Sequence, residues 1–90
     1  MRYTYDPGKR AANLKKHGFD FKDARRVIES DRTVTFEDRR FGYEEQRFVT
    51  LGVLRGKVVA IVTAETDEEI RVVSMRRAER NEEEIYYRNV

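Results

Sequence analysis

The pattern of apolar and polar residues at the start of the chain predicts a short strand followed by two helices. Residues 2–5 alternate aromatic and polar side chains, which favours a strand. Asp6 is suited to cap a helix whose first residue is Pro7, and Gly18 is suited to end that helix in the left-handed conformation. Asp20 is then suited to cap a second helix, whose apolar residues recur at helical spacing at Phe21, Ala24, Val27 and Ile28.

Beyond this region the pattern changes to the two-residue alternation of strands. It predicts strands over 33–36, about 46–54, 57–65 and from residue 70. The stretch 57–65 is apolar on both faces, as a central strand should be. Short polar turns join the last three strands, so we expect them to form an antiparallel meander. Residues 78–88 contain helix-forming residues and predict a terminal helix.

Early helices followed by hairpin-linked strands indicate an α+β fold. We expect two N-terminal helices packed on a small antiparallel sheet, with a C-terminal helix. The 90 residues show no repeat, linker or low-complexity segment, so we expect one domain spanning residues 1–90.

The amino-acid composition limits the kinds of metal and cofactor site that the chain can form. The chain has no cysteine and one histidine, so thiolate and histidine metal sites lack ligands, and we expect no metal and no cofactor. The longest apolar run, Val58 to Val62, is far too short to span a membrane, and the first residues contain no apolar leader segment. We therefore expect a cytoplasmic protein.

Charge is distributed unevenly along the chain, although the formal net charge is only +2. Residues 9–26 hold seven Lys/Arg against two Asp, and residues 71–80 hold four Arg against one Glu. If these two basic blocks meet in space, they form the positive surface expected for phosphate ligands. Otherwise they are ordinary solvated charge.

Three arginines stand within and at the end of the last predicted strand, at positions 71, 76 and 77. Guanidinium groups are permanently charged and bind phosphate oxygens through paired hydrogen bonds. Regular alternation puts Arg71 and Arg76 on opposite faces of the sheet, so a site that uses both requires the strand to twist or bulge. The alternative is that Arg71 lies along the sheet while Arg76 and Arg77 end the strand.

Other candidates for acid–base chemistry also have structural alternatives. His17 at the end of the first helix can act as a general acid or base, or bind a helix-end carbonyl. Glu45 and Arg47 share a strand face, as a substrate-facing pair or as an ion pair. Glu82 and Tyr86 share a helix face, where they can meet over a substrate or brace one another.

The sequence as a whole resembles the BrnT family of bacterial toxins over nearly its entire length. Three segments carry the resemblance in the right order: Asp6-x-x-Lys9-x-x-x-Asn13-x-x-Lys16-His17-Gly18-x-x-Phe21-x-x-Ala24, then Glu45-x-Arg47-x-x-x-x-Gly52, and finally Ile70-Arg71-Val72-Val73-Ser74-x-Arg76-x-Ala78 followed by Glu82-x-x-x-Tyr86.

This resemblance implies a ribonuclease of RelE-like fold, the toxin of a type II toxin–antitoxin pair, which cuts RNA and stops translation and growth. It also implies a BrnA-like antitoxin partner whose ribbon-helix-helix portion binds DNA. The toxin itself then reaches DNA only indirectly, through the antitoxin.

Metal-independent RNA cleavage needs a base for the ribose 2′-OH, an acid for the leaving oxygen and cations for the phosphorus centre. By motif position we assign the cationic role to Arg47, Arg71 and Arg76. His17, Glu45 and Glu82 are the acid–base candidates, Tyr86 is a candidate for base stacking or hydrogen bonding, and Lys9, Lys16 and Arg77 are candidates for substrate binding. Two other hypotheses remain: a noncatalytic RNA- or DNA-binding module, and a degenerate toxin that serves as a structural partner of its antitoxin.

Overall fold

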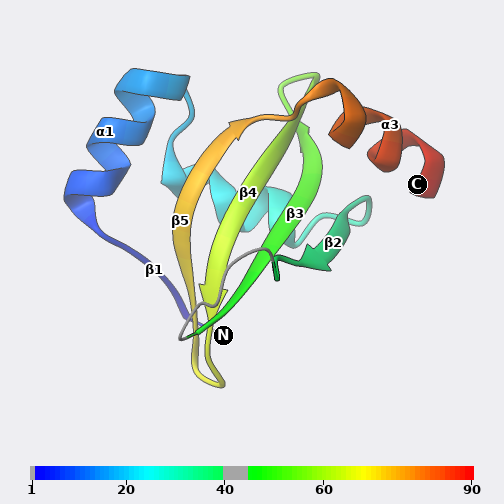
Figure 1. Ribbon diagram of the computed structural model, residues 1–90. Helices are drawn as coiled ribbons and strands as arrows, with labels where there is room; N and C mark the ends of the chain where they lie inside the picture. The colour runs from blue at the N-terminus through cyan, green and yellow to red at the C-terminus, as the bar shows by residue number, and fades with distance from the viewer. Residues whose placement is uncertain (1, 40–44) are drawn as a thin grey trace.

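A computed structural model describes residues 2–39 and 45–90 of the chain. The elements follow one another as β1 (Arg2–Tyr5), α1 (Pro7–His17), a 3₁₀ turn (Phe21–Asp23) that continues into α2 (Ala24–Ile28), β2 (Val34–Glu37), β3 (Gln46–Leu54), β4 (Lys57–Glu65), β5 (Glu69–Arg77) and α3 (Arg80–Asn89), as Figure 1 shows. No helix in these described ranges is both long enough and apolar enough to cross a membrane.

The α+β class predicted from the sequence is confirmed, but the five-stranded sheet is mixed and not purely antiparallel. Its strand order is β1-β5-β4-β3-β2. The neighbours from β2 to β5 are antiparallel, whereas β1 pairs with β5 in parallel, with Arg2 opposite Glu69. The alternation within β1 indicates a strand but does not specify its partner or direction, so the sequence pattern could not reveal this pairing.

Helix α1 has the two ends that its sequence predicts. The Asp6 carboxylate accepts hydrogen bonds from the backbone N–H groups of Gly8 at 2.7 Å and Lys9 at 3.1 Å. At the other end Gly18 has φ of 77°, the left-handed conformation that glycine adopts without strain. The helix lies beside β5 and does not cover the sheet (Figure 1).

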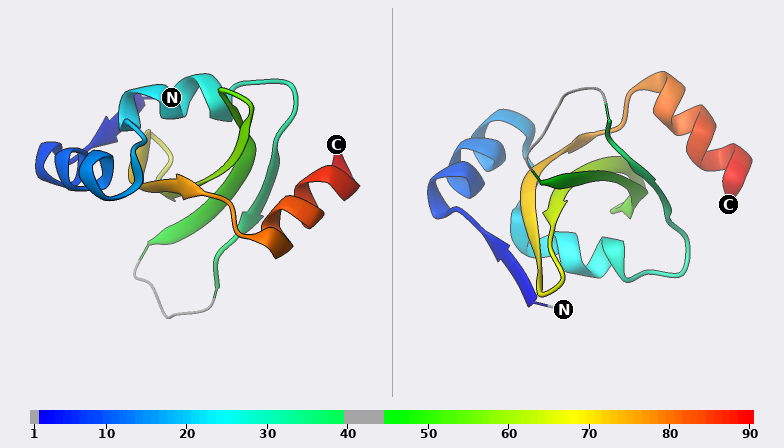
Figure 2. Two further views of the ribbon diagram at one scale, coloured as in Figure 1. Left: turned by 90° about the horizontal axis from the view of Figure 1, so that it is seen from above. Right: turned by 60° about the horizontal axis from the view of Figure 1, so that its bottom comes forward.

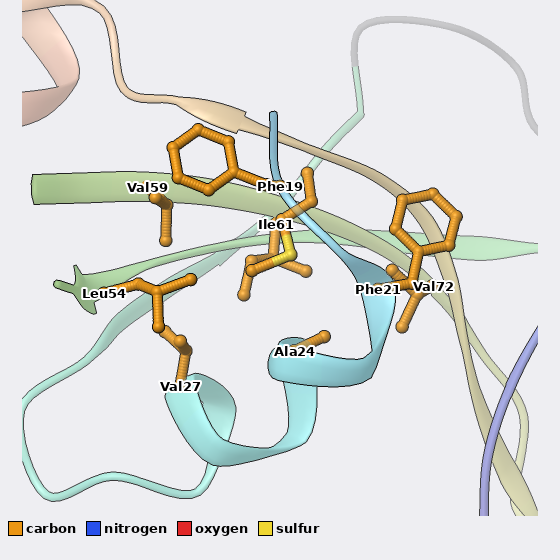
Figure 3. Packing of buried hydrophobic residues seen from close by; sticks show 9 residues of the cluster. Phe19, Phe21, Ala24, Val27, Leu54, Val59, Ile61 and Val72 are labelled. Atoms are coloured by element: carbon orange, nitrogen blue, oxygen red, sulfur yellow. The ribbon is translucent and has the colours of Figure 1, made fainter. Parts of the chain in front are cut away.

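Different helices pack on the two faces of the sheet: α2 lies across one face, and α3 packs at one end of the other and extends beyond it (Figure 2). On the α2 face, two phenylalanines that precede or enter α2 pack with α2 and sheet residues, as Figure 3 shows for Phe19, Phe21, Ala24, Val27, Leu54, Val59, Ile61 and Val72. Burying a side chain such as Ile61 fully contributes roughly 1.5–3 kcal/mol to folding. On the opposite face, Tyr86 of α3 and Ala78 pack against Val49, Leu51, Val58 and Ala60.

Close packing of α2 requires a glycine in β3. A Cβ atom at Gly52 would come within 2.6 Å of Val27 Cγ1, well inside any normal contact. Gly52 therefore allows α2 to approach the sheet closely.

Candidate functional site

A bulge in β5 decides where the arginines of that strand lie. Ser74 pairs with Val62, but Val72 pairs with the next residue, Thr63, so Val73 is an extra residue in the strand. One extra residue reverses the alternation beyond it. The sequence alone left open whether the strand bulges, and the structure shows that it does.

As a result, Arg71 and Arg76 lie on the same face of the sheet. They pair with Ala64 and Ala60, which are four residues apart in β4 and so share a face. Arg47 in β3 also pairs with Ala64, from the other side. Three arginines predicted as site residues are therefore together on one face, which we call the arginine face and which is defined by Arg47, Arg71 and Arg76.

The residues of β4 between the arginines are small and buried. Arg47 and Arg71 flank Ala64, so their backbones are two strand spacings apart, about 9–10 Å. Ala60 is fully buried and Ala64 is 2% exposed, so neighbouring side chains cover both alanines. A ligand on this face would therefore meet the partly exposed side chains of Arg47 and Arg71, and not the backbone of β4.

Each β5 arginine of this face is held by one of the predicted glutamates. Arg71 forms an ion pair with Glu45. Arg76 binds Glu82 through two hydrogen bonds, from Nη1 to Oε1 at 2.7 Å and from Nη2 to Oε2 at 3.1 Å. Two parallel bonds of this kind fix the guanidinium plane as well as its position. The arginine face therefore contains two ion pairs, Arg71–Glu45 and Arg76–Glu82, at different positions along β5.

Glu82 also determines where α3 begins. Its Oε1 atom accepts the backbone N–H of Glu79 at 2.8 Å, which is half of a capping box at the start of the helix. The same carboxylate thus caps α3 and binds Arg76, so the first turn of α3 is fixed against the arginine face.

A hollow of about 370 Å³ opens at this junction, and it contains an acidic residue that the sequence analysis did not single out. Phe36, Asp38, Val49, Arg76 and Glu82 are among its lining residues. Asp38 is only 7% exposed, and its backbone N–H donates to the carbonyl of Arg47 at 2.8 Å. Alternation from Phe36 would have placed Asp38 on this face, but in the sequence it stands in an acidic stretch that suggests a solvated turn.

Thr4 is a second residue of this face that the sequence analysis passed over. It pairs with Arg71 in the parallel register of β1 and β5, so its side chain lies beside that arginine. Its hydroxyl is buried and, within residues 2–39 and 45–90, has no hydrogen-bond partner.

The other predicted site residues lie elsewhere. Lys9, Lys16 and His17 line a separate hollow between α1 and β5. Arg77 pairs with Val59, whose side chain is in the α2-face core, so Arg77 is on the opposite side of the sheet from Arg76.

Tyr86 lies in the core of the arginine-face side. It is 3% exposed, and its hydroxyl donates to the carbonyl of Arg32 at 2.9 Å. Glu82 and Tyr86 thus point to different surroundings although they are four residues apart on α3: one binds Arg76 and the other packs in the core and ties α3 to the segment before β2.

A carboxylate with a strongly lowered pKa, Asp20, stands away from the arginine face. Arg10 donates to both carboxylate oxygens of Asp20, at 2.7 and 2.8 Å. These bonds, followed by the backbone N–H of Lys22, hold the pKa of Asp20 well below its usual range. The pair joins α1 to the turn before α2, which is a structural role. Among the described residues, no three His, Cys, Asp or Glu side chains gather closely enough to hold a metal ion.

Comparison with known families gives one match. The model of a family described as "Ribonuclease toxin, BrnT, of type II toxin-antitoxin system" matches residues 5–82. This range contains all of the arginine face and both of its paired glutamates. A search of curated proteins finds no match to the chain.

Proposed function

Since the chain belongs to the BrnT family of ribonuclease toxins of type II toxin–antitoxin systems, we propose that it is a metal-independent endoribonuclease that cuts RNA on its arginine face. The observation that carries the proposal is the bulge at Val73, because it puts Arg71 and Arg76 on one face with Arg47. Without it, alternation would separate the two β5 arginines.

The proposed reaction is an internal phosphoryl transfer. The ribose 2′-oxygen attacks the adjacent phosphorus, the bond from phosphorus to the 5′-oxygen breaks, and the products carry a 2′,3′-cyclic phosphate and a 5′-hydroxyl. The proton of the 2′-OH passes to a base, and the leaving 5′-oxygen takes a proton from an acid. Negative charge builds up on the phosphoryl oxygens between these events, and positioned cations stabilise it.

The arginine face supplies candidates for two of these needs, the cations and the base. Arg47, Arg71 and Arg76 are the proposed cations, and Glu45 and Glu82 are the proposed bases, because glutamate is ionised near neutral pH. In the free protein each glutamate is bound to an arginine. An arriving phosphate would compete for those guanidinium groups and release a carboxylate next to the 2′-OH.

The remaining candidates take different places in this proposal. His17 lies with α1 and not on the arginine face, so it acts as the acid only if the RNA reaches across β5. Tyr86 is buried and hydrogen-bonded, which supports a bracing role and no contact with substrate.

The same proposal extends to the biological setting that the family implies. The fold is RelE-like, the RNA is cut in the cytoplasm, and the cut stops translation and growth. A BrnA-like antitoxin with a ribbon-helix-helix portion neutralises the toxin and carries the DNA contact. Expression of the chain alone should halt incorporation of labelled amino acids, and co-expression of a ribbon-helix-helix protein encoded beside it should restore that incorporation.

Cleavage of a 5′-labelled single-stranded RNA in excess EDTA tests the proposed chemistry. The native chain should cut it and leave a 2′,3′-cyclic phosphate, and RNA with 2′-O-methyl riboses should stay intact. Arg71→Ala should lower kcat by about 10²–10³-fold, the usual loss when one charge-stabilising group is removed. Arg80→Ala is the control, because Arg80 is highly exposed at the start of α3.

Three outcomes would count against the proposal. Native rates in both Arg71→Ala and Arg76→Ala would remove the arginine face from the reaction. Activity that disappears in EDTA and returns with Mg²⁺ would refute metal independence. RNA binding without any cutting would favour the noncatalytic module. Urea unfolding of each variant shows whether a lost activity reflects a lost fold.

A further inference from the structure

The hollow between α1 and β5 gathers cationic side chains at a place separate from the arginine face. It has a volume of about 250 Å³, and Lys9, Lys16 and His17 of α1 line it together with Ser74 of β5. Two elements far apart in the sequence form its walls, so its charge is concentrated by the fold and not by the order of residues.

A buried asparagine fixes this wall of α1 against the strand. Asn13 is 8% exposed, its Nδ2 donates to the carbonyls of Met75 at 2.8 Å and Phe19 at 3.1 Å, and its Oδ1 accepts the Met75 N–H at 3.1 Å. Lys9 stands four residues before Asn13 and His17 four residues after it, and these spacings place side chains on one face of a helix. The same hydrogen bonds therefore hold α1 in register with β5 and position the flanking Lys9 and His17 side chains.

Within the described residues the lysines, Lys9 and Lys16 included, form no ion pair, whereas several arginines do. Arg10 of the same helix binds Asp20, and Arg71 and Arg76 bind glutamates. In the parts of the chain that the structure describes, no carboxylate lies within ion-pair distance of the side chains of Lys9, Lys16 or His17.

Helix electrostatics explains only some of these positions. Lys16 and His17 are in the last turn of α1, where the helix dipole favours positive charge. Lys9 is in the first turn, where the dipole disfavours a cation, and that turn contains no acidic residue within the helix. The Asp6 carboxylate, which accepts the Lys9 N–H at 3.1 Å, offsets part of this unfavourable position, and a negatively charged ligand would offset it further.

The hollow also adjoins the arginine face. Ser74 lines the hollow, and it pairs with Val62, which packs against the core of the arginine-face side. It stands between Arg71 and Arg76 in the strand. A polymer of phosphates lying over the arginine face can therefore cross β5 at Ser74 and continue into the hollow.

From these observations we infer that the α1–β5 hollow is a second phosphate subsite, which binds a phosphate of the RNA strand other than the one that is cut. Lys9 and Lys16 supply the charge, and His17 and Ser74 supply hydrogen-bond donors. The inference rests on the proposed function for the identity of the polymer. An acidic protein segment is the competing ligand for the same hollow. The test below distinguishes RNA from such a segment.

Binding, measured apart from cleavage, tests the inference. The probes are fluorescein-labelled, fully 2′-O-methylated RNA oligonucleotides of two and ten nucleotides, titrated at several salt concentrations. For the ten-mer, Lys9→Ala/Lys16→Ala should weaken binding several-fold and reduce the steepness of log K against log salt by about 1.4, since each contact with a single strand contributes about 0.7. For the dinucleotide, binding should be nearly unchanged. Lys15→Ala, on an exposed part of α1, is the matched control.

The outcomes separate this inference from the proposed function. Length-dependent loss of binding supports the subsite even if the chain cuts no RNA. Normal cleavage together with native ten-mer binding by the double variant overturns the subsite and leaves the catalytic proposal intact. A double variant that loses binding to a polyglutamate peptide but keeps native RNA binding would also overturn it, in favour of an acidic partner.

Discussion

Replacement of Asn13 by alanine should strongly destabilise the fold, because this one side chain completes the edge of β5. Beyond Val72 the strand has no β1 neighbour, and Asn13 satisfies both the N–H and the carbonyl of Met75 in place of a strand. The substitution leaves these two groups and the Phe19 carbonyl without their bonds. A buried polar group that loses its partner costs about 1–3 kcal/mol.

The net effect should be about 2–4 kcal/mol. Water from the adjoining hollow can form hydrogen bonds with some of the three backbone groups that lose Asn13. The cost for each group is therefore toward the lower end of the range of about 1–3 kcal/mol. Alanine also gains up to about 0.7 kcal/mol of helix propensity over asparagine. Folded domains are stable by about 5–15 kcal/mol, so the variant should stay folded but be clearly weakened.

Urea unfolding followed by circular dichroism measures this effect. With a slope of about 1.5 kcal/mol/M, the midpoint of Asn13→Ala should fall by about 2 M. Lys15→Ala on the same helix should leave the midpoint nearly unchanged. Asn13→Asp should be more stable at pH 5 than at pH 7, since its carboxylate would face two carbonyl oxygens and its pKa would rise in the folded state. If the Asn13→Ala midpoint moves no further than that of Lys15→Ala, the hydrogen bonds to Met75 do not hold α1 to the sheet.

Two further predictions concern the Asp20 ion pair and the bulge. The lowered pKa of Asp20 means that its pair with Arg10 stabilises the fold above about pH 4 and that this contribution is lost as the pH falls further. Asp20→Asn should therefore be less stable at neutral pH and lose less stability between pH 4 and 2, and equally steep acid unfolding curves would contradict this. Deletion of one of the adjacent valines Val72 and Val73 should remove the extra residue and leave a cooperative urea transition, whereas deletion of Ile61 from the regular ladder of β4 should abolish it. Loss of the fold in both deletion variants would show that the bulge is required for folding and does not only set the register of β5.

Local patterns were sufficient to locate most elements of this protein. The cap at Asp6 and the left-handed Gly18 bound α1 where the sequence indicates, and the strands Gln46–Leu54 and Lys57–Glu65 match the stretches of apolar residues. These features depend on neighbours a few residues away. The pairing of β1 with β5 depends on contacts across the whole chain, and the sequence pattern contains no signal for it.

The candidate site likewise has features that the local sequence predicts and features that depend on distant contacts. The sequence singled out Arg71 and Arg76 because of their residue type, but regular alternation placed them on opposite faces. Only the register between β4 and β5 reveals the extra residue that puts these two arginines on one face. The sequence has two adjacent valines at this position. Two adjacent valines also occur in a regular strand, so they do not reveal that one of them is an extra residue.

The position of β5 in the sheet has a consequence for the order in which the protein is assembled during synthesis. β5 is the last strand to be made, yet it lies between β4 and the first strand, and Arg2 meets its partner 67 residues later in the chain. Pairings between such distant segments form late and slowly. A nascent chain that ends before β5 has neither the complete sheet nor two of its three face arginines. On the proposed function, the growing polypeptide therefore acquires its RNA site only when this final strand is inserted.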